Sequence, residues 1–284
     1  GLRDESGKEE KGRSFTCPNC GAPITVNFAD SKTITCGACN SIIDLTQGIG
    51  GELKHAEQDE PVRPLIALGT LGQLQGAAWQ VVGFQHRMGE EPGDDERFGW
   101  DEYLLYNKKR GFSFLVDATD GWSMVQPTTG APTMAESGSA ATYMGKRFQQ
   151  QSAYNAETTY VAGEFYWKVE RGQKTFNRDF TAGATLLSME RSANELTWSS
   201  GGKLDSATVA SAFKLDASKD MFKRSDVLPA SAALGSSLGC GTIVLIAVVI
   251  IVLLIILSTC SSSSGGSRSS GGSYGGFSSG GGHK

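Results

Sequence analysis

The pattern of hydrophobic and polar residues in the middle of the chain is that of short β-strands. Aromatic and β-branched residues gather in runs such as 100–106, 112–116 and 122–125, and the segments between these runs are polar turns that contain glycine. Runs of this kind at a spacing of roughly 8–12 residues are typical of all-β domains. The pattern therefore predicts an antiparallel β-barrel or sandwich within residues 65–214.

Strand signals continue after a polar stretch at 127–139. They resume at 142–148 and recur as far as Trp198. Asp205 or Ser206 is a suitable N-cap for one short helix through Phe213. The two halves of the region have similar lengths and a similar rhythm, which leaves open that it contains two tandem copies of one unit.

An uninterrupted aliphatic run at 242–257 lies near the C-terminal end, and no charged residue occurs between Asp226 and Arg268. A helix needs about 20 apolar residues to span a bilayer, and the flanking residues extend the run to 238–260. The alternatives are a buried strand, which rarely exceeds about 10 residues, and a core helix, which would carry a polar stripe. The run therefore predicts one transmembrane helix.

Two Cys-x-x-Cys pairs near the start, Cys17 with Cys20 and Cys36 with Cys39, have the spacing of a four-thiolate zinc site. The residues between them alternate as short strands, so residues 14–46 are similar to a zinc ribbon. Four cysteines leave no open position on the metal, which predicts a structural Zn²⁺ ion. The alternative is two disulfide bonds, but thiolates in a reducing compartment favour metal.

The remaining segments are predicted to connect or flank these domains. Residues 1–13 are a charged lead-in without apolar periodicity, and residues 47–64 have the composition of a linker. Residues 215–237 would join the β-rich domain to the transmembrane helix. Residues 261–284 are rich in serine and glycine, which is typical of a flexible tail.

Charge argues against nucleic acid as a partner. The whole chain has a formal net charge of −4, and the charged residues between Ser14 and Asp44 are only Asp30, Lys32 and Asp44. Four thiolates and one Zn²⁺ ion would add about −2. Nucleic-acid-binding proteins instead concentrate lysine and arginine on one face. The ribbon is therefore predicted to dock proteins or to stabilise the fold.

Spaced aromatic and glycine residues in the β-rich region suggest a family. They include Gly76, Trp79, Val81 and Gly83, then Trp100, Glu102 and Tyr103, and later Glu164, Trp167, Val169, Glu190, Arg191, Asn194, Glu195 and Trp198. With these residues, the segment from about Leu65 to Lys214 resembles the bacterial domain-of-unknown-function family numbered 4178. The resemblance implies a membrane-associated accessory role in envelope or membrane stress, and it implies no catalytic residue.

Few residues suggest catalysis. His86 is interpreted as a partly exposed side chain, and Asp101 and Glu102 point to opposite faces of a strand, so they cannot act as a pair. The acidic segment 90–96 lacks the spaced ligands of a calcium-binding loop. The tryptophans at 79, 100, 122, 167 and 198 are interpreted as core residues, with a ligand groove as the alternative.

These observations predict a non-enzymatic adaptor or sensor that engages protein partners through its ribbon and β-rich domain. The alternative is a small-ligand-binding protein or enzyme with a site among the aromatic strands. Lys223 and Arg224 before the predicted span, against Arg268 after it, favour a cytoplasmic N-terminal portion. The predicted location is the bacterial inner membrane, with the lipid bilayer as a further partner.

Overall fold

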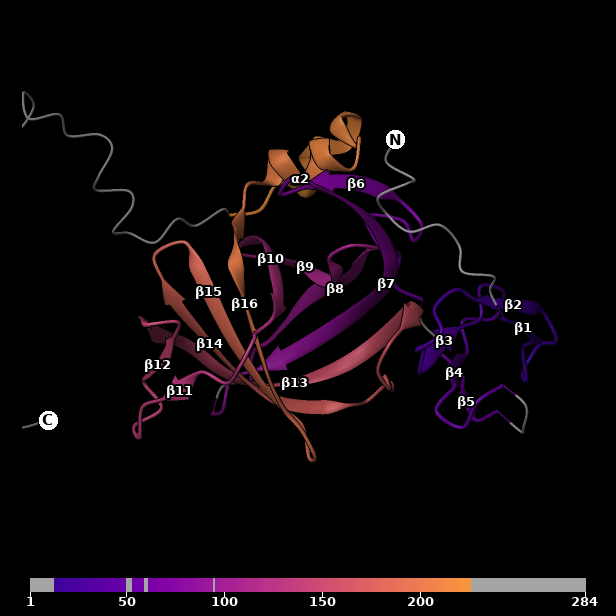
Figure 1. Cartoon of the computed structure of the whole chain (residues 1–284), viewed down its shortest axis with the longest axis horizontal. Helices are drawn as coiled ribbons and strands as arrows, with labels where there is room; N and C mark the ends of the chain where they lie inside the picture. Colours follow the sequence, from indigo (N-terminus) through magenta and orange to yellow (C-terminus); the bar gives the residue numbers. More distant parts are fainter. Residues whose placement is uncertain (1–12, 50–52, 59–60, 94, 226–284) are drawn as a thin grey trace, which may run out of the picture. The chain divides into compact units, whose positions relative to one another are not determined.

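Eight antiparallel strands close into a barrel in the computed structural model, which describes residues 13–49, 53–58, 61–93 and 95–225 (Figure 1). Around the ring the order is β13, β14, β15, β16, β10, β9, β8 and β7, and the pairing of β7 with β13 closes it. Their bounds are β7 Ala77–Glu90, β8 Arg97–Asn107, β9 Gly111–Ala118, β10 Gly121–Pro127, β13 Lys146–Phe165, β14 Lys174–Ala182, β15 Thr185–Arg191 and β16 Leu196–Leu204.

The long strand β13 makes the closure possible because it pairs with different neighbours along its length. Residues 149–157 pair with β14, and residues 155–163 pair with β7. The register of β13 shifts between Gln150 and Ser152 and again between Thr158 and Tyr160. Such bulges bend a strand and increase its twist, as a closed barrel requires.

Gly163 marks a close approach of two backbones at this closure. Its φ is +96°, and an added Cβ would lie 2.3 Å from the backbone oxygen of Val82. Only glycine adopts this conformation without strain and leaves room for the neighbouring strand.

The ribbon extends the barrel sheet on one side. It contains β1 Arg13–Thr16, β2 Pro23–Val26, β3 Thr33–Thr35, β4 Ile42–Asp44 and β5 His55–Ala56. β1 and β2 form a separate two-stranded sheet, whereas β3 pairs with β13 through Glu164 opposite Ile34 and Phe165 opposite Thr33. β5 lies in the segment predicted as a linker and pairs with β4.

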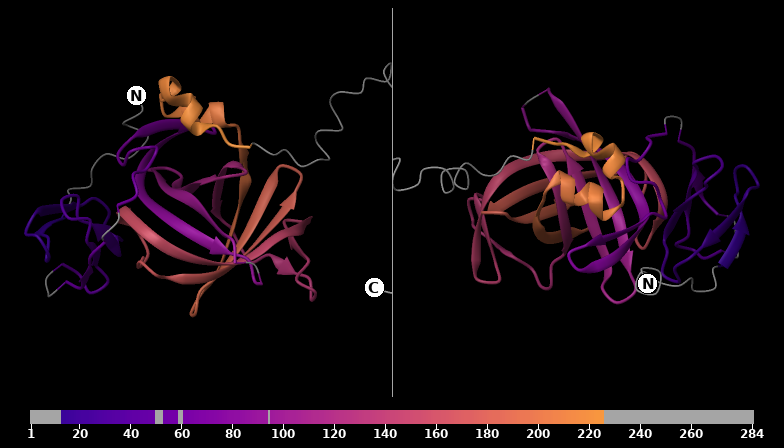
Figure 2. Two further views of the ribbon diagram at one scale, coloured as in Figure 1. Left: turned by 180° about the vertical axis from the view of Figure 1, so that it is seen from behind. Right: turned by 90° about the horizontal axis from the view of Figure 1, so that it is seen from above.

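The largest hydrophobic cluster lies where the helices cover one face of strands β7 to β10. The covering elements are α2 Ser206–Ala212 and the 3-10 helix η1 Asp216–Phe222, and Figure 2 shows them over these strands. Trp122 stacks on Phe222 with ring centroids 5.5 Å apart, and its Nε1 donates to the Phe222 carbonyl at 2.8 Å. Asp205 caps α2 as predicted, because its carboxylate accepts from the Thr208 amide at 3.0 Å.

The shorter strands sit beside the barrel. β6 Leu71–Leu74 pairs with the start of β7. β11 Thr133–Met134 pairs with β12 Ala140–Tyr143, which in turn pairs with the first residues of β13.

The possibility of two tandem copies stays a prediction, because two copies of one unit can share a single ring. The strands before and after the polar stretch at 127–139 belong to one ring, since β10 pairs with β16 and β7 pairs with β13. The mainly β architecture itself is confirmed, with the barrel as its form.

The predicted fold class needs correction for its transmembrane helix. Within residues 13–49, 53–58, 61–93 and 95–225, no helix is long and apolar enough to cross a membrane. The two helices there have seven residues each. The span predicted at 238–260 lies outside the described residues, as do the predicted lead-in, up to residue 12, and the predicted tail.

Candidate functional site

The four cysteines of the ribbon lie on two matching turns. Cys17 follows β1 and Cys36 follows β3, and each Cys-x-x-Cys turn is closed by a hydrogen bond of 2.9 Å, from Gly21 N to Cys17 O and from Asn40 N to Cys36 O. Gly21 and Asn40 both have positive φ, +76° and +59°. The left-handed residue after the second cysteine turns the chain so that both thiols of a pair face the same side.

The sulfur atoms have the separations that a tetrahedral metal site requires. All four Sγ atoms lie within 4.8 Å of one another, with 3.7 Å between Cys17 and Cys39 and 3.6 Å between Cys20 and Cys36. Ligands at about 2.3 Å from a tetrahedral zinc ion are roughly 3.8 Å apart. A disulfide requires about 2.05 Å between sulfurs, so these cysteines are free thiols, and they lie close enough together that they could hold one metal ion.

Hydrogen bonds around the thiols favour the deprotonated form of one of them, Cys39. The hydroxyl and the backbone amide of Ser41 lower the pKa of Cys39 to about 6. The Asn19 amide Nδ2 lies 3.7 Å from the Cys39 sulfur and donates to the Ser41 hydroxyl at 2.9 Å. Thiolates are the form that binds metals, so these bonds favour the thiolate at Cys39. At Cys20 the backbone of Ala22 lowers the pKa, but the Cys39 thiol, burial and the other thiols raise it by more, to about 12.

A buried carboxylate of the barrel strand β13 joins the ribbon to the barrel. Glu164 is 4% exposed. Its oxygens accept from Asn27 N at 3.0 and 3.1 Å, from Asn27 Nδ2 at 3.0 Å, from Phe28 N at 2.8 Å and from the Ser31 hydroxyl. These donors all come from the loop between β2 and β3. The negative charge of Glu164 is therefore stabilised by neutral donors of the ribbon.

Further contacts hold the residues that follow Glu164. Lys32 N donates to Phe165 O at 2.9 Å, and the Thr33 hydroxyl bridges Trp167 O at 3.2 Å and Val169 N at 3.0 Å. The ring of Phe28 contacts Tyr106 at 4.6 Å and Phe112 at 5.7 Å between centroids. Ribbon and barrel are thus joined by backbone pairing, a buried carboxylate and aromatic contacts.

A polar network around Arg87 lies inside the barrel. Its Nη1 is 2.5 Å from Glu190 Oε2 on β15 and 3.4 Å from Glu102 Oε1 on β8. In the ring, β8 and β15 are four strands apart in either direction, so one guanidinium can reach both only through the barrel interior. Nη2 donates to the Thr175 hydroxyl at 2.6 Å, and the Trp100 ring lies 5.5 Å from the guanidinium.

Arg87 keeps its charge in this interior. Its side chain is 4% exposed, and burial lowers its pKa, but Glu102 and Glu190 raise it by more, so the net pKa lies above the ordinary value. Trp100 Nε1 donates to Glu102 at 2.7 Å and completes the shell of that carboxylate. The Arg87 Nε is buried without a hydrogen-bond partner, but Nη1 and Nη2 tie strands β8, β14 and β15 to β7. Because buried polar networks of this kind fix a packing arrangement, we assign this network a structural role.

On the opposite face of β7 and β8, His86 forms a pair with Asp101. His86 Nδ1 lies 2.7 Å from Asp101 Oδ1. The neighbouring Asp117 on β9 binds Arg224 in two places, Nε to Oδ1 at 2.5 Å and Nη2 to Oδ2 at 2.6 Å. Burial raises the pKa of Asp117 although Arg224 opposes the shift. These side chains line a pocket of about 290 Å³.

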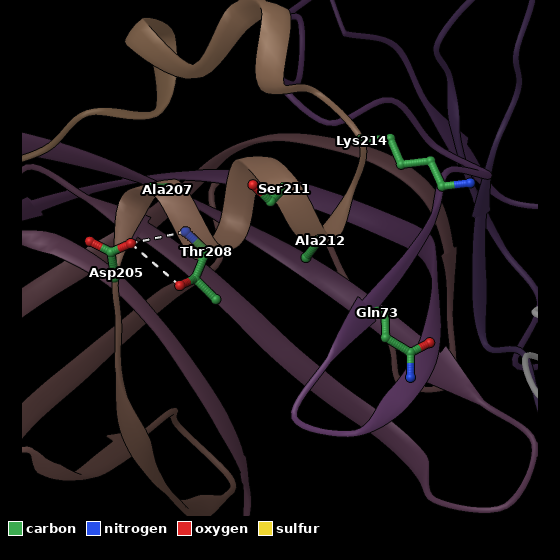
Figure 3. A pocket seen from close by; sticks show the side chains of 7 residues that line it. All are labelled: Gln73, Asp205, Ala207, Thr208, Ser211, Ala212 and Lys214. Atoms are coloured by element: carbon green, nitrogen blue, oxygen red, sulfur yellow. Dashed lines mark hydrogen bonds between the residues drawn. The ribbon is translucent and has the colours of Figure 1, made fainter.

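A second hollow lies along α2 and is lined by Gln73, Asp205, Ala207, Thr208, Ser211, Ala212 and Lys214 (Figure 3). Its volume is about 580 Å³. Its carboxylate, Asp205, is already occupied by capping the helix, with the Thr208 amide at 3.0 Å and hydroxyl at 3.3 Å. The groove therefore offers mainly small side chains and no converging chemical groups.

The structure can be compared with each predicted site residue. Cys17, Cys20, Cys36 and Cys39 come together as predicted, and in the described part of the chain they are the one group of three or more potential metal ligands in close proximity. Asp101 and Glu102 point to opposite faces as predicted, toward His86 and Arg87 respectively. Trp79 and Trp122 are fully buried core residues.

Sequence reasoning missed the partners of His86 and Arg87. His86 pairs with Asp101 because β7 and β8 place these residues directly opposite each other. Glu102 lies 15 positions after Arg87 in the chain, and Glu190 lies 103 positions after Arg87. The strand register that brings them together cannot be read from local alternation, which gives the face of a residue and not its neighbour.

Comparisons with known proteins find one family model that matches the barrel region. Residues 67–206 match the model of the domain of unknown function DUF4178, which is about half of the 284-residue chain and supports the predicted family. No curated protein and no solved structure matches the chain. The predicted bacterial origin stays a prediction.

Proposed function

We propose, with the DUF4178 match of residues 67–206 as the premise, that this protein is a non-enzymatic adaptor whose ribbon and barrel together bind protein partners. The contact that carries the proposal is the buried Glu164, which ties the β2–β3 loop of the ribbon to strand β13. Because of this tie the two parts form one binding unit, unlike two modules on a flexible linker.

The proposed metal is a structural Zn²⁺ ion held by Cys17, Cys20, Cys36 and Cys39. The sulfur separations of 3.6 and 3.7 Å support four-coordinate binding. Four thiolates fill the coordination shell of zinc, so the ion would fold the ribbon and would not activate a substrate. The order of the β2–β3 loop, and with it the partner surface, would then depend on the metal.

Metal analysis tests the first part of this proposal. We expect about one zinc ion per chain in freshly purified, reduced protein, and loss of the ion in the Cys17→Ser variant. A stoichiometry near zero in the reduced wild-type protein would reject the zinc centre.

Crosslinking in cell extract followed by mass spectrometry tests the adaptor role. We expect a specific set of proteins with the wild type and with the matched ribbon variant Asp30→Asn, whose side chain is exposed. Cys17→Ser should lose this set, and Glu164→Gln should reduce it. The absence of any specific protein, or equal capture by Cys17→Ser, would contradict the role.

A further inference from the structure

Two arginines on the outer face of the barrel contact the same aromatic ring. Arg178 and Phe176 lie on β14, and Arg191 on β15 lies directly opposite Phe176. The guanidinium carbon of Arg178 is 5.5 Å from the centroid of the Phe176 ring, and that of Arg191 is 5.3 Å from it. Thr175, the residue before Phe176, points the other way and binds the interior Arg87. The attraction between a cation and an aromatic face thus holds two positive charges close together outside the barrel.

Neither arginine forms an ion pair with a carboxylate among the residues that the structure describes. Arg178 Nη1 donates to Gly138 O at 3.4 Å and lies 3.7 Å from Met134 Sδ, and its Nε is buried without a hydrogen-bond partner. Within the described part of the chain, Nη2 of Arg178 and the whole guanidinium fork of Arg191 accept no such partner either. Since part of Arg178 is already out of water, an anion that binds it has less hydration to displace.

The turn between β11 and β12 fixes the position of Arg178. Gly138 in this turn has φ +72°, and an added Cβ would overlap with Arg178 Nη1. Its amide donates to Ala135 O at 2.8 Å, which closes the turn. Glycine adopts this conformation at no steric cost and leaves the space that the guanidinium fills. Arg178 is therefore held in place before any partner binds, and such pre-organisation lowers the entropy cost of binding.

Exposed apolar side chains border the two arginines. Leu196 on β16 lies directly opposite Arg191 and is 53% exposed, and Met134, which contacts Arg178, is 40% exposed. Directly opposite residues of neighbouring strands lie on one face of a sheet, so Phe176, Arg191 and Leu196 form one row. We call these five residues the arginine patch. Protein interfaces are enriched in arginine, aromatic residues and methionine, and the patch has this composition.

The charge and composition of the arginine patch define the class of its partner. Carboxylates meet a guanidinium fork through two parallel hydrogen bonds, and in the same row Asn155 separates Phe176 from Glu90 of β7. Nucleic acid fits less well, because its binding proteins neutralise several phosphates and because leucine and methionine border the patch. Anionic lipid surfaces are recognised by clusters of about 4–8 lysines and arginines, more than the patch holds.

From these observations we infer that the arginine patch binds an acidic segment of a protein partner. Aspartate or glutamate side chains of the segment would pair with Arg178 and Arg191, and an apolar side chain beside them would cover Leu196. This inference rests on the proposed adaptor role and gives that role a second surface, on strands that do not pair with the ribbon.

Fluorescence anisotropy with labelled peptides tests the inference on the full-length protein. The probe is a peptide in which pairs of glutamates alternate with leucines, and its counterpart has glutamine in place of every glutamate. We expect saturable binding of the acidic peptide, and binding of the glutamine peptide weaker by about tenfold or more. Arg191→Gln, at an exposed position, should weaken the acidic peptide by a similar factor with an unchanged melting temperature. The matched control Arg110→Gln, also at an exposed position, should leave binding unchanged.

Vesicles containing phosphatidylglycerol and a thymidine oligonucleotide represent the two other classes of anion. The inference is overturned if the acidic peptide does not bind, if Arg191→Gln and Arg110→Gln behave alike, or if vesicles or oligonucleotide bind the wild type more tightly than the peptide. Cys17→Ser should keep peptide binding, because β14, β15 and β16 do not pair with the ribbon. If the double variant Arg178→Gln with Arg191→Gln retains the crosslinked partner set, the adaptor role stands and this inference is overturned.

Discussion

The ribbon buries seven residues in its hydrophobic cluster, and two of these seven are the candidate metal ligands Cys17 and Cys36. The main cluster of the barrel contains sixteen buried residues, including Trp79, Tyr103 and Trp122. Very small domains rarely bury enough apolar surface to fold alone and usually need a metal or a disulfide. The comparison predicts that the ribbon needs a bound metal and the barrel to stay folded, whereas the barrel depends on its own core.

The ribbon junction and the barrel interior also differ in the partners that stabilise a buried charge. Glu164, which faces the ribbon, is surrounded by neutral donors from one loop. Arg87, inside the barrel, is held by two carboxylates from opposite walls. The first arrangement depends on the conformation of the ribbon loop, and the second depends only on closure of the barrel.

Removal of the metal should have the largest effect and should affect the ribbon alone. Structural zinc contributes roughly 10–16 kcal/mol to the folding of small zinc domains. We expect chelation to unfold residues 14–46, measured as loss of amide protection in hydrogen exchange. The amides of β8, β9 and β10 should keep their protection. Equal loss in both regions would show that the barrel needs the ribbon.

Arg87→Met should be the most damaging single substitution inside the barrel. It leaves the largely buried Glu102 and the partly exposed Glu190 close together without a cation. Breaking a fully buried ion pair costs about 3–5 kcal/mol, and because Glu190 reaches solvent we expect a loss at the low end, about 3 kcal/mol. Urea denaturation monitored by tryptophan fluorescence measures the loss. The ribbon should retain its zinc in this variant, and loss of the metal would argue against separate sources of stability.

Glu164→Gln should have an intermediate effect at the junction. The amide nitrogen of glutamine cannot accept from the donors of Asn27, Phe28 and Ser31, and a buried unsatisfied donor costs about 1–3 kcal/mol. The matched control is Glu170→Gln. Glu170 forms an exposed ion pair with Lys168 at 2.6 Å, and such pairs contribute about 0–1 kcal/mol. Equal losses in the two variants would mean that the Glu164 network does not hold the junction.

The pH dependence of stability should give the smallest effect, and it should arise in the barrel. Burial raises the pKa of Asp179, although Ser188, Tyr154 and Ser152 donate to it and oppose the shift. A raised pKa means that the folded state holds the proton more tightly, so this stabilisation is complete below the unfolded pKa of about 3.9 and is lost as pH rises through the folded value.

Asp179→Asn should remove this dependence. We expect the variant to gain stability relative to wild type between pH 4 and pH 7, with the smallest gain at the acid end. Thermal melts across this range are the measurement. A difference that is constant with pH would contradict the raised pKa.

Much of the fold follows from local features of the sequence. The alternation of aromatic and polar residues around Trp100 and Trp122 predicts strands, and the turn residues predict antiparallel pairing. The cysteine spacing predicts the metal centre because both halves of the site are local turns. The single closed ring could not be predicted, since it depends on the register shifts at Gln151 and Thr159 of β13, and no local pattern marks them.

The candidate sites differ in the same way, because one is built from residues close in sequence and the other from residues on different strands. Cys17 and Cys20 are three positions apart, and their common function is visible in the sequence. His86 and Asp101 come together only through the pairing of β7 with β8, and Asp117 and Arg224 are 107 positions apart. Side-chain pairs on different strands depend on the register in which those strands pair. Local sequence patterns do not give this register, so such pairs could not be predicted from one sequence.

The position of Glu164 has a consequence for the order of events during synthesis. The ribbon leaves the ribosome first, but its partner carboxylate lies 137 positions after Asn27, and contacts this distant in the chain form late. For the seconds needed to make the intervening residues at about 5–20 residues per second, only the metal and its own small core would keep the nascent ribbon folded. A cell short of zinc would then expose an open thiol-bearing segment before any strand of the barrel exists.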